Sequence, residues 1–78
     1  MASVTIRFCR SLNYRPRAAR AAAALKSALN IDANLVEGKR GEFTVWVDDK
    51  SVAQKTMFGG FPSEDDVVAA VREALHAA

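Results

Sequence analysis

The fold is decided by a short alternating stretch that ends in the only cysteine of the chain, Val4-Thr5-Ile6-Arg7-Phe8-Cys9. Apolar and polar residues alternate in it, which predicts a strand with one face in the core. A helix is expected to begin at Pro16, because the N–H that proline lacks is not needed in a first turn. Cys9 therefore falls in a strand-to-helix turn near a helix N-terminus, where a thiolate is stabilised.

The rest of the chain predicts two helices and three further strands. An alanine-rich segment from Pro16 to about Leu29 is expected to be helical and to end at Asn30. Its apolar face is formed by Ala18, Ala21, Ala22, Leu25, Ala28 and Leu29. The three strands are expected at residues 31–37, 42–47 and 51–57. Ser63, with Asp66 three residues later, resembles a capping box that opens the last helix.

This β-α-β-β-β-α order predicts an α/β fold of two layers, as a single domain over residues 1–78. The first β-α-β unit should be a right-handed crossover between parallel strands. We expect a four-stranded mixed sheet in the order 4-3-1-2, with both helices on one face. The other face then carries Thr5, Arg7, Thr44 and a partly exposed Trp46, which is either an ordinary solvent-edge aromatic or part of a partner surface. This open face would also allow a weak homodimer in place of a monomer.

Composition excludes several classes of protein. With one cysteine and one histidine among 78 residues, neither a disulfide within the chain nor a metal ligand set is expected. Apolar stretches all fall well short of the roughly 20 residues that a membrane span needs. The N-terminal sequence does not resemble a signal peptide. A single unpaired cysteine fits a reducing compartment, so we expect a cytoplasmic protein that does not associate with membranes.

The net charge of +2 is unevenly distributed along the chain. Residues 1–31 contain six basic residues and no acid, whereas residues 32–78 contain nine acids and five bases. The basic half can lower the pKa of Cys9, attract anionic substrates, or simply be a solvated helix face. Nucleic acid is not an expected partner, because the chain has no recognition motif and no strand that combines aromatic and basic residues.

Three segments resemble the selenoprotein W-like (Rdx) family. Residues 4–17 are similar to its opening, in which a strand runs into Cys-x-x-Sec or Cys-x-x-Cys and then often Gly-Tyr, a basic residue, Pro and a basic residue. Residues 41–45 resemble its Gly-x-Phe-x-Val strand, and residues 59–62 the Gly-Gly-Phe-Pro of its bacterial members. The resemblance covers nearly the whole chain. It implies a thioredoxin-like fold and a thiol or selenol redox protein, without a bound cofactor, that is tied to glutathione.

The sequence departs from the family at its second redox position. Cys9 matches the first cysteine, but Leu12 stands where the family has Sec or Cys, so no intramolecular disulfide can form. If Cys9 is redox-active, it attacks a disulfide or peroxide and is restored by an external thiol, with glutathione as co-substrate and Arg10 or Arg15 binding its carboxylates. The alternative is a catalytically degenerate module that binds a protein partner. Whether the protein is an enzyme therefore stays open.

Several neighbours of Cys9 have two interpretations each. Ser11 is either a hydroxyl beside the thiol or part of a solvated turn. Tyr14 either hydrogen-bonds near Cys9 or, more commonly for such a residue, packs over the helix start. Leu12 either fills an apolar gap, which we favour, or forms an exposed tip for a partner. The fold can also place a glycine-rich loop beside the turn, with Phe58 or Phe61 shielding the sulfur, and this loop is Phe58-Gly59-Gly60-Phe61.

Overall fold

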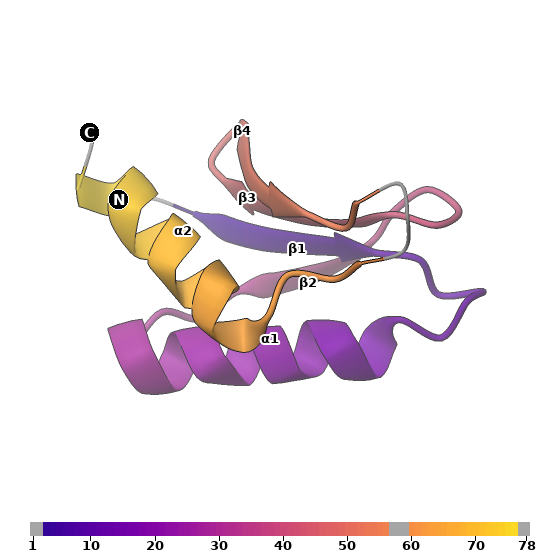
Figure 1. Ribbon diagram of the computed structural model, residues 1–78, viewed down its shortest axis with the longest axis horizontal. Coiled ribbons are helices and arrows are strands. Elements are labelled where there is room, and N and C mark those ends of the chain that lie inside the picture. The colour runs from indigo at the N-terminus through magenta and orange to yellow at the C-terminus, as the bar shows by residue number, and fades with distance from the viewer. Residues whose placement is uncertain (1–2, 57–59, 77–78) are drawn as a thin grey trace.

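The computed structural model describes residues 3–56 and 60–76, which form a four-stranded sheet covered by two helices on one face (Figure 1). The elements are β1 (Val4–Phe8), α1 (Arg15–Leu29), β2 (Asn34–Glu37), β3 (Phe43–Val47), β4 (Lys50–Gln54) and α2 (Glu64–His76). The strands lie in the order β2-β1-β3-β4, with β1 parallel to β2 and antiparallel to β3, and with β3 antiparallel to β4. The predicted fold and strand order are confirmed.

The core lies between the sheet and the helices. The inward residues of β1 and β3 are buried against both helices. In α1 the buried residues are Ala18, Ala21 and Leu25, whereas Ala28, in the last turn, is exposed. In α2 they are Val67 and Val71. Alanines at the contact let α1 approach β1 closely, which fixes the position of the turn that joins the two elements.

The helix boundaries follow from local chemistry. At the end of α1, Asn30 has φ 56° and its N–H donates to the Lys26 carbonyl oxygen, while the Ile31 N–H donates to the Leu25 carbonyl oxygen. These bonds confirm Asn30 as the predicted helix terminator. At the start of α2, the Ser63 hydroxyl accepts the Asp66 N–H at 3.0 Å, and the Asp66 carboxylate accepts the Ser63 N–H at 3.3 Å. This reciprocal pair confirms the capping box.

Three strands are shorter than predicted, and β3 begins at Phe43 in place of the predicted residue 42. The second strand begins at Asn34 and not at residue 31, because the Ile31 N–H still points back to the Leu25 carbonyl at the end of α1. The last strand ends at Gln54, and Met57, the predicted end, lies outside the described residues. Among the helices that the structure describes, neither has the length and apolar character needed to cross a membrane.

Candidate functional site

Cys9 directly follows β1 and is fixed by backbone hydrogen bonds. Its N–H donates to the Glu42 carbonyl at 2.8 Å, and its carbonyl accepts the Tyr14 N–H at 3.2 Å. Between them the chain reverses through Asn13, which has φ 60°. Cys9 is only 2% exposed, so its sulfur lies just beneath the surface of this turn.

Hydrogen-bond donors surround the sulfur. The Ser11 hydroxyl lies 3.2 Å from the Cys9 Sγ. That hydroxyl, and then the backbone N–H of Gly41, hold the pKa of the Cys9 thiol below its usual value. Burial opposes this effect, and the backbone N–H groups of Leu12 and Ser11 add to it. The arrangement favours a thiolate at Cys9, the form that attacks disulfides and peroxides.

The source of this stabilisation differs from the predicted one. We expected N–H groups of the helix and the charges of Arg10 or Arg15, but α1 begins six positions after Cys9, and the pKa is lowered by groups in the two turns beside the sulfur. Arg10 and Arg15 are exposed and contribute no resolved effect on the thiol pKa. The turn carries these side chains outward, where water screens their charges.

The structure separates the alternatives for the other residues of the turn. Ser11 is exposed, yet its hydroxyl contacts the sulfur. Leu12 is 42% exposed, so it forms a surface tip, and the interpretation that it fills an apolar gap is wrong. The tip points outward because the chain turns back at Asn13 before α1 begins. The Tyr14 ring packs against the Phe61 ring near the start of α1, which is the interpretation that we considered more common for such a residue.

Phe61 joins the glycine-rich loop to this turn. Its ring makes edge-to-face contacts with Tyr14 at 4.9 Å and with Phe43 at 5.4 Å between ring centroids. The Arg17 guanidinium lies 4.0 Å from the Phe61 ring centroid. Phe61 therefore lies beside the start of α1, which follows the Cys9 turn. Gly60 is exposed, and Phe58 and Gly59 lie outside the described residues.

Trp46 belongs to a separate polar cluster on the open face of the sheet. It is half-buried, as predicted, with the Arg7 guanidinium 5.1 Å from its ring centroid. The indole N–H donates to the Thr44 hydroxyl at 2.9 Å, which donates to the Glu42 carboxylate at 2.7 Å. A second donor to that carboxylate is the Lys39 N–H at 2.8 Å. Trp46 thus has intramolecular partners that account for its position.

Sequence reasoning missed Gly41 and Glu42, which meet Cys9 across the sheet. Pairing of Phe8 with Phe43 places residues 41 and 42 opposite Cys9. Gly41 has φ 79°, a conformation that favours glycine and that directs the turn toward the sulfur. The sequence signal for this contact was the glycine before the predicted strand at residues 42–47. It could be interpreted only once the pairing register of the strands was known.

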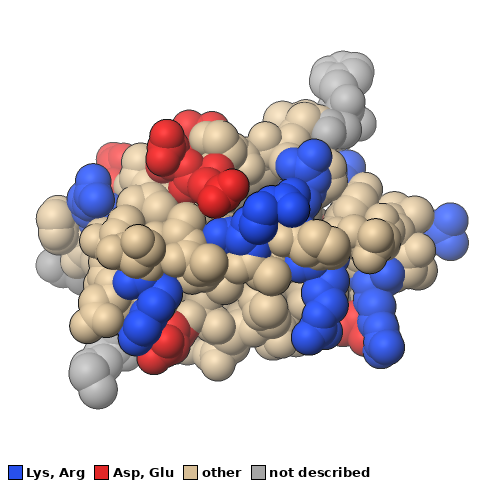
Figure 2. Space-filling model, turned by 90° about the horizontal axis from the view of Figure 1, so that it is seen from below, with Lys and Arg blue, Asp and Glu red and all other residues tan. Residues whose placement is uncertain are grey.

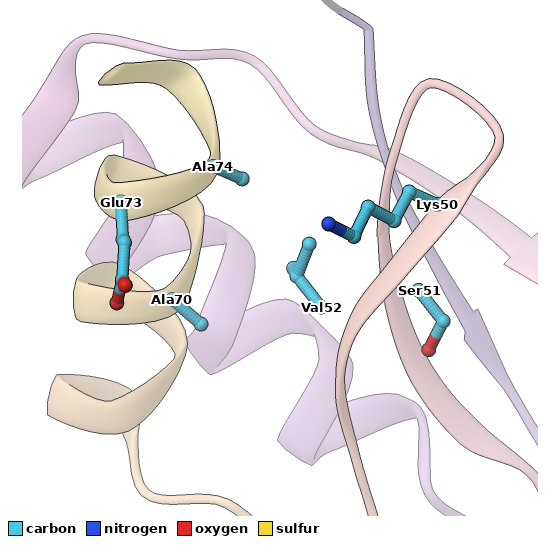
Figure 3. Close-up of a pocket in the computed structure, with 6 residues that line it drawn as sticks. All are labelled: Lys50, Ser51, Val52, Ala70, Glu73 and Ala74. Carbon is cyan, nitrogen blue, oxygen red and sulfur yellow. The ribbon is translucent and has the colours of Figure 1, made fainter. Parts of the chain in front are cut away.

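A groove at the other end of the molecule is distinct from this site. It has a volume of about 300 Å³ and lies between β4 and α2 (Figure 3). Val52, Ala70 and Ala74 line it, and the Lys50 ammonium points toward it. Lys50 pairs with Val47, and Val47 with Val4, at the end of β1 away from Cys9. Residues 3–56 and 60–76 contain no group of three metal-ligating side chains.

Comparisons with known proteins identify the family of this chain and agree with its fold. The Rdx family model matches residues 3–73. A crystal structure of a protein from Bordetella parapertussis superposes with a TM-score of 0.81 at 25% identity, covering 94% of this chain and 96% of that chain. A selenoprotein W-related protein from Vibrio cholerae superposes with a TM-score of 0.80 at 22% identity, covering 95% of this chain and 96% of that chain. No curated protein matches the sequence.

Proposed function

This chain belongs to the Rdx family and has the thioredoxin-like fold of selenoprotein W-related proteins, and we propose that it is a cytoplasmic monothiol redox protein that acts through Cys9 in cell redox homeostasis. The observation that carries the proposal is the Ser11 hydroxyl 3.2 Å from the Cys9 Sγ. Together with the amides around the sulfur, it favours the nucleophilic thiolate.

The chemistry needs one protein sulfur and glutathione. The Cys9 thiolate attacks the glutathione sulfur of a mixed disulfide, forms a Cys9–glutathione disulfide, and releases the substrate thiolate with the electron pair of the broken S–S bond. A glutathione thiolate then attacks that disulfide, which yields glutathione disulfide and restores the Cys9 thiolate. The external thiol is required because Leu12 stands at the second redox position. Since Cys9 is 2% exposed, the turn must open locally to admit the substrate.

Intact-mass spectrometry tests this proposal. The wild-type protein is treated with glutathione disulfide and then with reduced glutathione. We expect one glutathione adduct that reduced glutathione removes, and no adduct on Cys9→Ser. A control thiol, Ser51→Cys in the Cys9→Ser background, is exposed and distant from the turn. If Cys9 forms its adduct no faster than this control thiol, or if the adduct resists reduced glutathione, the proposal is wrong.

A second function is favoured by one specific observation, the 42% exposure of Leu12 beside Cys9. An apolar tip at this position suits a module that binds a protein partner without redox chemistry. The Cys9→Ser variant distinguishes the two functions, because it abolishes the redox function but leaves partner binding intact. Retention of the cellular function by that variant would support the second candidate.

A further inference from the structure

The surface around Cys9 is cationic and has few internal partners. Arg10, in the turn, and Arg15, Arg17 and Arg20, on α1, are all exposed. Figure 2, which shows the molecule from the α1 side, has basic side chains spread over this face, while most of the acidic ones lie in one cluster at the upper left. In the described part of the chain the one salt bridge joins Lys26 to Asp32 at 3.3 Å, so none of these arginines is paired with a carboxylate there.

The two helices differ in the charges of their first turns. The first turn of α2 contains Glu64, Asp65 and Asp66, which the positive end of the helix dipole favours. The first turn of α1 contains no acid and begins with arginines, and its N-cap residue Tyr14 makes no side-chain capping hydrogen bond. Cations at this helix end are unfavourable for the fold alone. Residues that destabilise a helix locally, and that form no salt bridge to offset this cost, are typical of a functional surface.

Two further contacts give this surface a defined shape. Arg17 is held over the Phe61 ring at 4.0 Å, so this charge is fixed in place. The exposed Leu12 projects from the same turn as Arg10, directly beside the sulfur. An apolar tip and cations without a salt-bridge partner in the described residues therefore lie on the turn and the helix that follow the reactive thiol.

We propose that this surface docks an acidic protein segment whose cysteine carries the glutathione that Cys9 removes. The inference rests on the proposed redox function and names the substrate class of that site. Carboxylates on both sides of the partner cysteine would face Arg10 and Arg15, while an apolar neighbour would contact Leu12. A nucleic acid fits less well, because the aromatic rings of this region, Tyr14 and Phe61, are stacked edge to face on one another and offer no free platform for bases.

The test uses three peptides of equal length, each with one cysteine held as a mixed disulfide with glutathione. Glutamate, glutamine or lysine flanks the cysteine. The Cys9 thiolate attacks the glutathione sulfur, a Cys9–glutathione disulfide forms, and the peptide thiolate leaves with the electron pair of the old bond. Intact-mass spectrometry follows the rate at which the adduct on Cys9 appears. We expect the glutamate peptide to react about tenfold faster than the lysine peptide at low salt, with the difference shrinking as salt rises.

Matched variants locate the effect on the protein. Arg10→Gln combined with Arg15→Gln should remove most of the preference for glutamate. Lys50→Gln combined with Arg72→Gln removes the same charge from exposed residues elsewhere and should leave the preference intact. Equal rates for the three peptides, or equal effects of the two double variants, would overturn the docking proposal.

Failure of the redox function itself gives a different result. If no peptide reacts with Cys9 while the Ser51→Cys control thiol reacts with all three, Cys9 is not a redox thiol and both proposals are lost. A single-stranded oligonucleotide and polyglutamate of equal total charge are added as competitors. Inhibition by polyglutamate supports an acidic protein partner, whereas inhibition by the oligonucleotide alone overturns it in favour of nucleic acid.

Discussion

Removing the Phe61 ring tests the packing of this side chain against the start of α1 and against β3. The ring contacts Tyr14 at 4.9 Å and Phe43 at 5.4 Å, and the Arg17 guanidinium lies 4.0 Å from its centroid. Each aromatic pair contributes about 1 kcal/mol beyond the burial of area, and the cation–π contact contributes about 0.5 kcal/mol. With the loss of a half-buried apolar surface, we expect Phe61→Ala to lower the free energy of unfolding by about 3 kcal/mol.

Urea denaturation followed by tryptophan fluorescence measures this loss. A domain of this size unfolds with an m-value of about 1 kcal/mol per molar urea, so the midpoint should fall by about 3 M. Phe61→Leu keeps most of the apolar volume but removes both edge-to-face contacts and the cation–π contact, so its loss should be about 2.5 kcal/mol. A Phe61→Ala midpoint within about 0.5 M of wild type would refute the packing argument, and Phe61→Leu decides the question if Phe61→Ala does not fold.

Three further predictions concern the site and its supports. Ser11→Ala should raise the pKa of Cys9 and slow its alkylation at neutral pH about fivefold, because one net hydrogen bond is lost. Ser11→Thr keeps a hydroxyl and should keep the wild-type pH profile, whereas an unchanged Ser11→Ala profile would contradict the role of the hydroxyl. Leu12→Cys should form a disulfide with Cys9 on mild oxidation, because the residue 12 amide already lies at the sulfur; two thiols that stay free would show that the turn geometry is wrong. Glu42→Gln should lower the free energy of unfolding at neutral pH but not in acid. If the difference in unfolding free energy between this variant and the wild type does not change with pH, the charge of Glu42 has no role.

The sign of the Glu42 effect follows from its surroundings. Burial favours the neutral carboxyl, but the Thr44 hydroxyl, the Lys39 N–H and the charges of Arg7 and Lys39 together outweigh it and lower the Glu42 pKa. A pKa that is lower in the folded than in the unfolded chain stabilises the fold above the unfolded pKa. This contribution is lost as the pH falls through the folded pKa, which places the effect in the acidic range.

The fold was predictable because its main signals are local. Alternation in β1 and β3 fixed which residues enter the core, and Asn30 and Ser63 marked helix boundaries through hydrogen bonds to residues a few positions away. The start of β2 was not predictable in this way. The apolar residue Ile31 suggested a strand, but its N–H completes the end of α1, and a tertiary arrangement decides between the two.

The site was predictable only in part for the same reason. The position of Cys9 after β1 follows from the sequence, but the Gly41 amide reaches its sulfur through the pairing of β1 with β3. Leu12 seemed suited to the interior by residue type, whereas the reversal of the chain at Asn13 leaves it on the surface. Contacts between residues distant in sequence thus decide which groups activate the thiol.

The rate of Cys9 alkylation as a function of pH tests the central claim most directly. Iodoacetamide reacts with the thiolate, so the midpoint of the profile reports the pKa of Cys9 in the folded protein. The hydrogen bonds around the sulfur predict a midpoint below about 8.5, the value of an unperturbed thiol. A midpoint at or above that value would contradict the conclusion that this turn holds an activated thiolate.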